Sequence, residues 1–139
     1  IEIGLEGTIA PAIGFELNVG GFLTLPSNFQ ELTELSCFNL GAFKTSGTAY
    51  GGDISGGPFI GFFGGGQKAI SGGFKNFNGG GGVYGGSLQF DNDGDFRGFT
   101  YDPSLGGGAS FSSTTTTSAS IQDAIEGLTN SSSKRCRCE

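Results

Sequence analysis

The stretch Tyr84-Gly-Gly-Ser-Leu-Gln-Phe90, Asp91-Asn-Asp-Gly-Asp95, Phe96-Arg-Gly-Phe-Thr-Tyr101 indicates the fold class of this chain. On both flanks, large apolar side chains alternate with small or polar ones, which is the pattern of a half-exposed β-strand. Between the flanks, Asp93-Gly94 supplies the positive φ that a tight reversal needs. We therefore predict a β-hairpin with strands over 84–90 and 96–101.

The first 19 residues carry the same alternation on either side of Pro11. One face holds Ile1, Ile3, Leu5 and Ile9, then Ile13, Phe15, Leu17 and Val19. The opposite face holds Glu2, Gly4, Glu6 and Thr8, then Gly14, Glu16, Asn18 and Gly20. This pattern predicts an antiparallel pair of half-buried strands. We expect the acidic side chains of these strands to face solvent.

Glycine is concentrated between residues 51 and 108, where 21 of the 29 glycines lie. Phe and Tyr recur among them, so the segment differs from a flexible Gly/Ser linker. Glycines within strands allow bulges, sharp bends and close backbone approach. We expect a strongly curved sheet, or closely stacked sheets, around a thin aromatic core.

The C-terminal part shows two further patterns. Residues 112–120 are a polar, β-branched run with little to bury, which predicts an edge or surface strand. Residues 120–129 place Ile121, Ala124, Ile125 and Leu128 on one face of a helix that Ser120 can cap. Residues 26–35 lack alternation and are expected to form a loop or a short helical turn.

Taken together, these patterns predict an all-β fold: a small antiparallel barrel or sandwich of about seven to eight short glycine-rich strands with one C-terminal helix. Its length of 139 residues fits one domain. We place that domain at 1–129, including the helix at 120–129, and a polar, cysteine-containing tail at 130–139.

Composition disfavours several functions. The net charge of -6 argues against nucleic-acid binding, which needs a basic surface. The chain has no His, so Ser-His-Asp and Cys-His catalysis in their usual forms are excluded. Carboxylate pairs among Glu2, Glu6, Glu16 and Asp53 remain as possible acids and bases, yet the sequence does not show that they converge. We predict a protein that is not an enzyme.

Three cysteines indicate an oxidising compartment. Cys37 stands alone, and Cys136 and Cys138 lie near the end of the chain. A disulfide from Cys37 to one of the pair would leave one thiol to join another chain, stay free or be trimmed away with the tail. With three Cys and no His, a zinc site is not expected. We predict a secreted, extracellular protein.

The hairpin turn partly resembles a calcium-binding loop. Asp91, Asp93 and Asp95 alternate through it, as carboxylates do around a hard cation. However, the Gly is fourth rather than sixth, and Asp102 stands where a bidentate Glu belongs. A calcium site and a plain solvated turn both remain open, and no other cofactor is expected.

These properties predict a secreted, non-catalytic structural or binding module. It would assemble with copies of itself through its glycine- and aromatic-rich sheet, or hold a ligand on exposed rings. The candidate rings are Phe59, Phe62, Phe63, Tyr84, Phe99 and Tyr101. The alternative is a membrane-active, pore-forming β protein that uses the Ser/Thr-rich segment 109–121.

Overall fold

A computed structural model describes residues 1–25, 38–65, 70–103, 105–121 and 124. It contains seven β-strands. They are β1 (Glu2–Ala10), β2 (Ile13–Thr24), β3 (Asn39–Phe63), β4 (Gly72–Gly82), β5 (Tyr84–Asp91), β6 (Phe96–Asp102) and β7 (Leu105–Ser120). The predicted all-β class is therefore confirmed.

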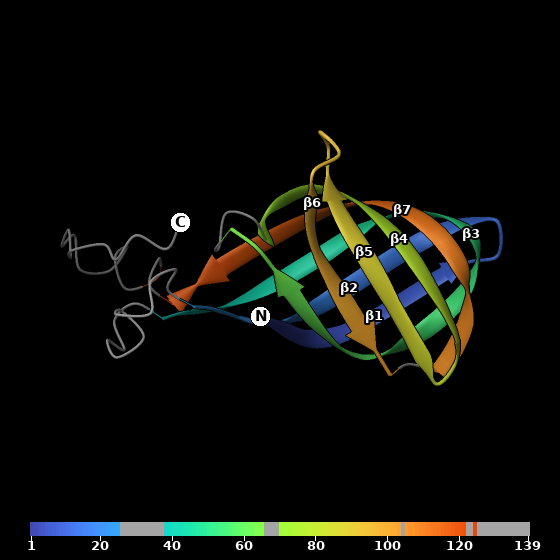
Figure 1. Cartoon of the computed structure of the whole chain (residues 1–139), viewed down its shortest axis with the longest axis horizontal. Coiled ribbons are helices and arrows are strands. Elements are labelled where there is room, and N and C mark those ends of the chain that lie inside the picture. The colour runs from blue at the N-terminus through green and yellow to red at the C-terminus, as the bar shows by residue number, and fades with distance from the viewer. Residues whose placement is uncertain (26–37, 66–69, 104, 122–123, 125–139) are drawn as a thin grey trace.

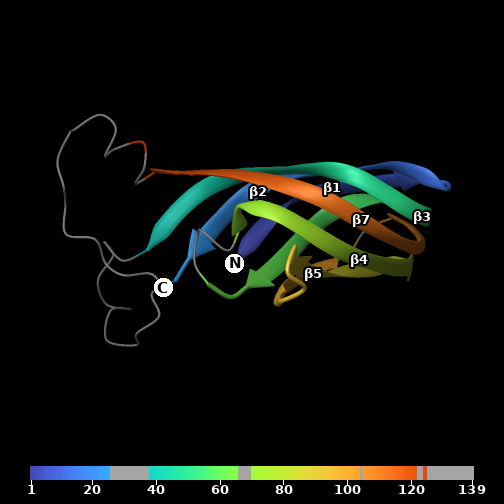
Figure 2. The ribbon, with the colours of Figure 1, turned by 90° about the horizontal axis from the view of Figure 1, so that it is seen from above.

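The strands close into an antiparallel barrel (Figure 1). Five strands form its ring in the order β3-β7-β4-β5-β6, and β6 pairs back onto the end of β3. The remaining two strands, β1 and β2, form a hairpin on the other edge of β3. From above, β5 lies opposite the wall that β1, β2 and β3 form (Figure 2).

The long strand β3 connects both parts of the barrel. Residues 39–50 pair with β2, and residues 53–61 pair with β1, although β1 and β2 also pair with each other. Strand β3 must therefore bend where these two stretches meet. Gly51, at φ +140°, lies at that point, and a Cβ there would come within 2.4 Å of the Ala109 carbonyl oxygen. Glycine thus permits both the bend and the close approach of β7.

The predicted hairpin over 84–101 is confirmed as β5 and β6. Gly94 has a φ of +93°, as the turn requires. The antiparallel pairing of the first two strands is confirmed as well, with Leu5 opposite Val19 and Ile9 opposite Phe15.

The C-terminal strand corrects one expectation and leaves another open. Strand β7 pairs with β3 along one edge and with β4 along the other, so 112–120 is not an edge strand. Ser120 ends β7. The helix predicted over 120–129 falls almost wholly outside the described residues and stays a prediction. The loop at 26–35, the tail at 130–139 and any disulfide of Cys37, Cys136 or Cys138 also lie outside the described residues and stay predictions. In the described part, no helix is long and apolar enough to cross a membrane.

The alternation along the strands was predicted correctly, but the two faces are reversed. Glu2 and Glu16 are about 95% buried, at 5% and 4% exposure. Ile3 and Leu5, which were expected to be buried, are 63% and 61% exposed. The barrel therefore has a largely polar interior and a largely apolar exterior.

One apolar cluster does lie inside the barrel. It consists of Phe22, Phe43, Phe59 and Ile70, and the rings of Phe43 and Phe59 meet edge to face at 6.0 Å. The expected thin aromatic core is thus present. It occupies only part of the interior, because polar side chains fill the rest.

Candidate functional site: the polar interior of the barrel

The polar interior is organised around Glu16 of β2. Its carboxylate accepts hydrogen bonds from the Nδ2 atoms of Asn18 (3.1 Å), Asn76 (3.2 Å) and Asn78 (2.9 Å), and from the Ser112 hydroxyl. These donors come from β2, β4 and β7. Several neutral donors thus satisfy the oxygens of this buried carboxyl group without a basic partner.

The network continues from β4 and β7 to Asp53 of β3. Asn78 also donates to the Ser110 hydroxyl (3.2 Å), and Ser110 donates to the Asp53 carboxylate (3.1 Å). Every other residue of β7 from Ser110 to Thr116 thus points inward, where its hydroxyl has polar neighbours. This explains how a Ser/Thr-rich strand can hold a position between two other strands.

A small pocket, partly open to solvent, lies at the glycine-rich end of this interior, and it has room for only about one or two water molecules. All seven strands contribute to its lining. Four of the lining residues are acidic, namely Glu6, Glu16, Asp53 and Asp102. Among the described residues, no lysine, arginine or histidine lines it. Burial, followed by the hydrogen bond to Asp102, raises the pKa of Glu6 to about 9, so this side chain is protonated at neutral pH.

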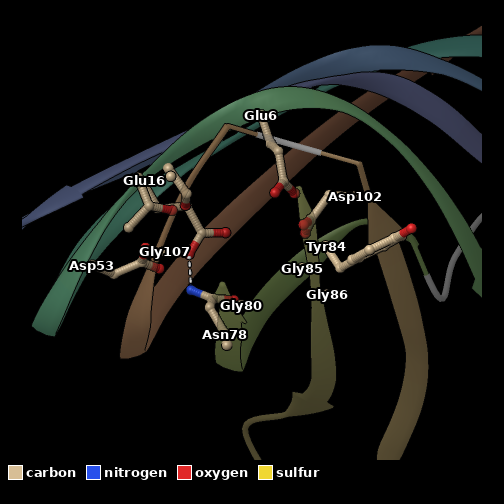
Figure 3. A pocket seen from close by; sticks show the side chains of 14 residues that line it. Glu6, Glu16, Asp53, Asn78, Gly80, Tyr84, Gly85, Gly86, Asp102 and Gly107 are labelled. Carbon is tan, nitrogen blue, oxygen red and sulfur yellow. Dashed lines mark hydrogen bonds between the residues drawn. The ribbon is translucent and has the colours of Figure 1, made fainter. Parts of the chain in front are cut away.

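The four acids form two pairs, which Figure 3 shows on different sides of the pocket. Glu6 and Asp102 point toward each other and are hydrogen-bonded. A hydrogen bond between two carboxyl groups requires a shared proton. Glu16 and Asp53 form the second pair, beside Asn78.

Glycines make room for these carboxylates. A Cβ on Gly85 of β5 would lie 2.0 Å from Oδ1 of Asp102, and a Cβ on Gly80 of β4 would lie 2.8 Å from the Tyr84 carbonyl oxygen. Any larger residue at Gly85 would therefore displace the Asp102 carboxylate. This is a local reason for the abundance of glycine in 79–86.

The three aspartates of the predicted calcium loop lie in the β5–β6 turn, away from the pocket. Asp91 accepts hydrogen bonds from the backbone N–H groups of Asp93 (3.0 Å) and Asp95 (2.9 Å), and it forms an ion pair with Arg97 at 2.6 Å. The Arg97 side-chain hydrogen bonds, followed by the Asp95 amide, lower the pKa of Asp91 from its usual range. These contacts favour a self-contained turn, and the calcium site stays a prediction.

The six predicted binding aromatics do not form one surface. Phe59 is 3% exposed within the apolar cluster, so the expectation that its ring is exposed was wrong. Phe62 and Phe99 lie side by side on the exterior with ring centroids 5.4 Å apart. Tyr101, two residues after Phe99 on β6, is also exposed. Tyr84 is also exposed and lines the pocket. Phe63 is half-buried.

The exterior carries a continuous line of apolar residues, which we call the outer apolar ring. Each member lies directly opposite the next on the neighbouring strand, from β2 through β3, β7, β4, β5 and β6 and back to the far end of β3. In this order the members are Ile13, Tyr50, Phe111, Phe77, Leu88, Phe99 and Phe62. On β1, Ile3 and Leu5 extend the apolar surface opposite Ile60 and Pro58 of β3.

One part of the exterior is polar, and we call it the outer polar patch. It consists of Lys44, Ser46 and Thr48 of β3 with Thr117, Thr115 and Ser113 opposite them on β7. All six side chains are exposed. The apolar exterior is therefore interrupted along this portion of the β3–β7 pair.

Sequence reasoning named Glu2, Glu6, Glu16 and Asp53 as acidic candidates but did not place them inside, and it did not connect Asp102 with them. Alternation alone could not decide the matter, because it separates two faces without saying which face a closed sheet turns inward. One available signal was the run 110–117, in which neither face is strongly apolar.

The chain matches no protein-family model, no curated protein sequence and no solved structure. What it does must therefore be inferred from its own geometry.

Proposed function

We propose that this protein is a non-catalytic, membrane-embedded β-barrel whose outer apolar ring faces lipid hydrocarbon. The observation that carries the proposal is the reversed polarity of the strands. In water-soluble antiparallel sheets the apolar face is buried, whereas barrels in membranes alternate apolar-out and polar-in.

The closed ring of strands also supports this proposal. Backbone N–H and C=O groups find no partner in hydrocarbon, so a sheet with open edges is not stable there. In the described part of the chain, β7, β4, β5 and β6 are paired along both edges, and β6 returns to β3. Tyr50 and the Phe side chains of the ring add the amphipathic and aromatic groups that favour a membrane environment.

Self-assembly in water, which the sequence also predicts, would cover the same apolar residues less completely. A second copy covers one side of a barrel, whereas the outer apolar ring passes over six strands. Lipid surrounds the barrel on every side. Of the segment 109–121, residues 109–120 enter this proposal as part of β7 with its inward hydroxyl groups, and not as a separate spanning hairpin.

Flotation with vesicles tests the proposal. The full chain, refolded from denaturant in the presence of phospholipid vesicles, is expected to float with them and to resist extraction by high salt and by alkaline carbonate. Recovery of a folded monomer, or of a defined oligomer, from lipid-free buffer without detergent would contradict the proposal. The second of these results would favour self-assembly.

A further inference from the structure

We propose that the tip of the β4–β5 hairpin, residues 79–86, is a proton-controlled lid over the interior pocket. It is closed while Glu6 and Asp102 share a proton, and it opens when both carboxyl groups are ionised. This goes beyond the proposed membrane function, and it applies to the folded barrel in lipid or in detergent.

The tip of the hairpin covers the pocket and touches the acid pair. Five residues of the tip are among those that line the pocket, namely Gly79, Gly80, Tyr84, Gly85 and Gly86. Gly85 lies opposite Asp102 in the β5–β6 pairing, and Figure 3 shows both beside Glu6. Because Gly85 has no room for even a Cβ next to the Asp102 carboxyl group, any displacement of this group acts directly on the tip.

The shared proton keeps the pocket from holding two adjacent negative charges. The titratable groups that face the pair are Glu16 from β2, Asp53 from β3 and Tyr84 from β5, whereas β4 and β7 contribute Asn78 and glycines. None of these described lining residues is basic. Loss of the proton therefore adds charge to a space that holds only about one or two water molecules. These charges become hydrated only if the pocket widens.

The tip is the part of the wall that has least packing to lose. A Cβ placed on Gly79, Gly81 or Gly82 would have no atom within 4 Å. The larger side chains of the tip, Val83 and Tyr84, are 52% and 67% exposed. The apolar cluster inside the barrel contributes no residue to the pocket. Segments with so few buried apolar contacts open at a lower free energy than the rest of a fold does.

Hydrogen exchange of the backbone amides in detergent, corrected for the intrinsic exchange rate at each pH, tests the proposal. In the open form both carboxyl groups titrate at their ordinary pKa of about 4, so each pH unit above that value favours opening by up to about tenfold. We expect the protection of residues 79–86 to fall about a hundredfold between about pH 5 and about pH 8.

Residues 43–47 of β3, which begin at Phe43 of the apolar cluster, are the internal reference, and their protection is expected to change by less than about threefold. An unchanged protection of 79–86 would overturn the proposal. An equal loss in both segments would also overturn it, because it would indicate unfolding of the whole barrel instead of a moving lid.

Variants identify the proton. The amide of Glu6→Gln donates to Asp102 at every pH without titrating, so the protection of 79–86 should no longer fall in this variant. Asp102→Asn is the second variant, with the same expectation. Asp93→Asn, an exposed acid in the β5–β6 turn, is the charge-matched control and should behave as the wild type does. A fall of wild-type size in either folded variant would overturn the proposal, and if neither variant folds, the comparison of the two wild-type segments still decides.

Discussion

At the scale of single residues, Asp91 shows how one side chain defines the β5–β6 turn. Its Oδ1 accepts hydrogen bonds from the backbone N–H groups of Asp93 and Asp95. Its Oδ2 accepts hydrogen bonds from Nε and Nη2 of Arg97 at 2.9 and 2.6 Å. The carboxylate therefore acts as a local cap for the turn and as the partner of the first basic residue after it. The ion pair with Arg97 needs the ionised form, and the negative charge also strengthens the two backbone hydrogen bonds.

A pH dependence follows from the lowered pKa of Asp91. A carboxylate whose pKa is lower in the folded state stabilises that state above its unfolded pKa of about 4, and this contribution is lost as pH falls through the folded pKa. We expect Asp91→Asn to melt at a lower temperature than the wild type at pH 7, and the difference to be smaller at about pH 2.

Thermal unfolding in detergent at the two pH values measures this difference, with Asp93→Asn as the control. If the melting difference between wild type and Asp91→Asn were the same at both pH values, the Asp91 carboxylate would not be the group responsible.

At the scale of elements, the contact between β3 and β7 depends on glycine. Gly47 lies opposite Thr114, and a Cβ on Gly47 would come within 2.1 Å of the Ser113 carbonyl oxygen and 2.5 Å of the Thr114 Cα. These neighbours are backbone atoms, which cannot rotate away as a side chain can. The two strands approach this closely only because position 47 has no side chain.

Gly47→Ala is therefore expected to destabilise the barrel by about 1–3 kcal/mol, as overpacking does. Gly52→Ala, in the same strand, is the matched control, because a Cβ at position 52 has nothing within 4 Å. We expect that variant to stay within about 0.5 kcal/mol of the wild type. Denaturant titration in detergent gives both values, and equal values for the two variants would contradict the close-approach argument.

At the scale of the whole molecule, the exterior combines a continuous apolar surface with one polar patch. Leu5 of β1 is flanked by Pro58 and Val19 on the neighbouring strands, so its environment is apolar. Thr115 of β7 lies in the outer polar patch opposite Ser46. If lipid covers the first region and water the second, the same substitution will have different effects at the two positions.

Leu5→Lys is expected to reduce incorporation into vesicles by about tenfold or more, since a lysine facing the middle of a bilayer costs about 2–4 kcal/mol. Thr115→Lys is expected to change it little. Flotation of the two variants beside the wild type measures the effect. Equal losses at both positions would show that the outer polar patch also lies in hydrocarbon, and no loss at either would argue against lipid contact altogether.

Much of the fold could be predicted from short-range patterns. The alternation in 1–19 and in 84–101 identified the strands, and Asp93-Gly94 identified the turn, because side-chain period and positive φ are local properties. The density of glycine between 51 and 108 predicted curvature for the same reason. The position of 112–120 could not be predicted this way. The inward hydroxyl groups of this strand form hydrogen bonds with side chains of β3 and β4, which are distant in sequence.

The sequence by itself therefore determined which residues are extended and which side chains share a face. Only the tertiary structure decided which of the two faces is inside. Closure of β6 onto β3 turned Glu6, Glu16, Asp53 and Asp102 toward one pocket and left Ile3 and Leu5 outside. The physical reason is that alternation only divides a strand's side chains between the two faces of the sheet. Which face becomes the interior depends on the direction in which the sheet curves when it closes.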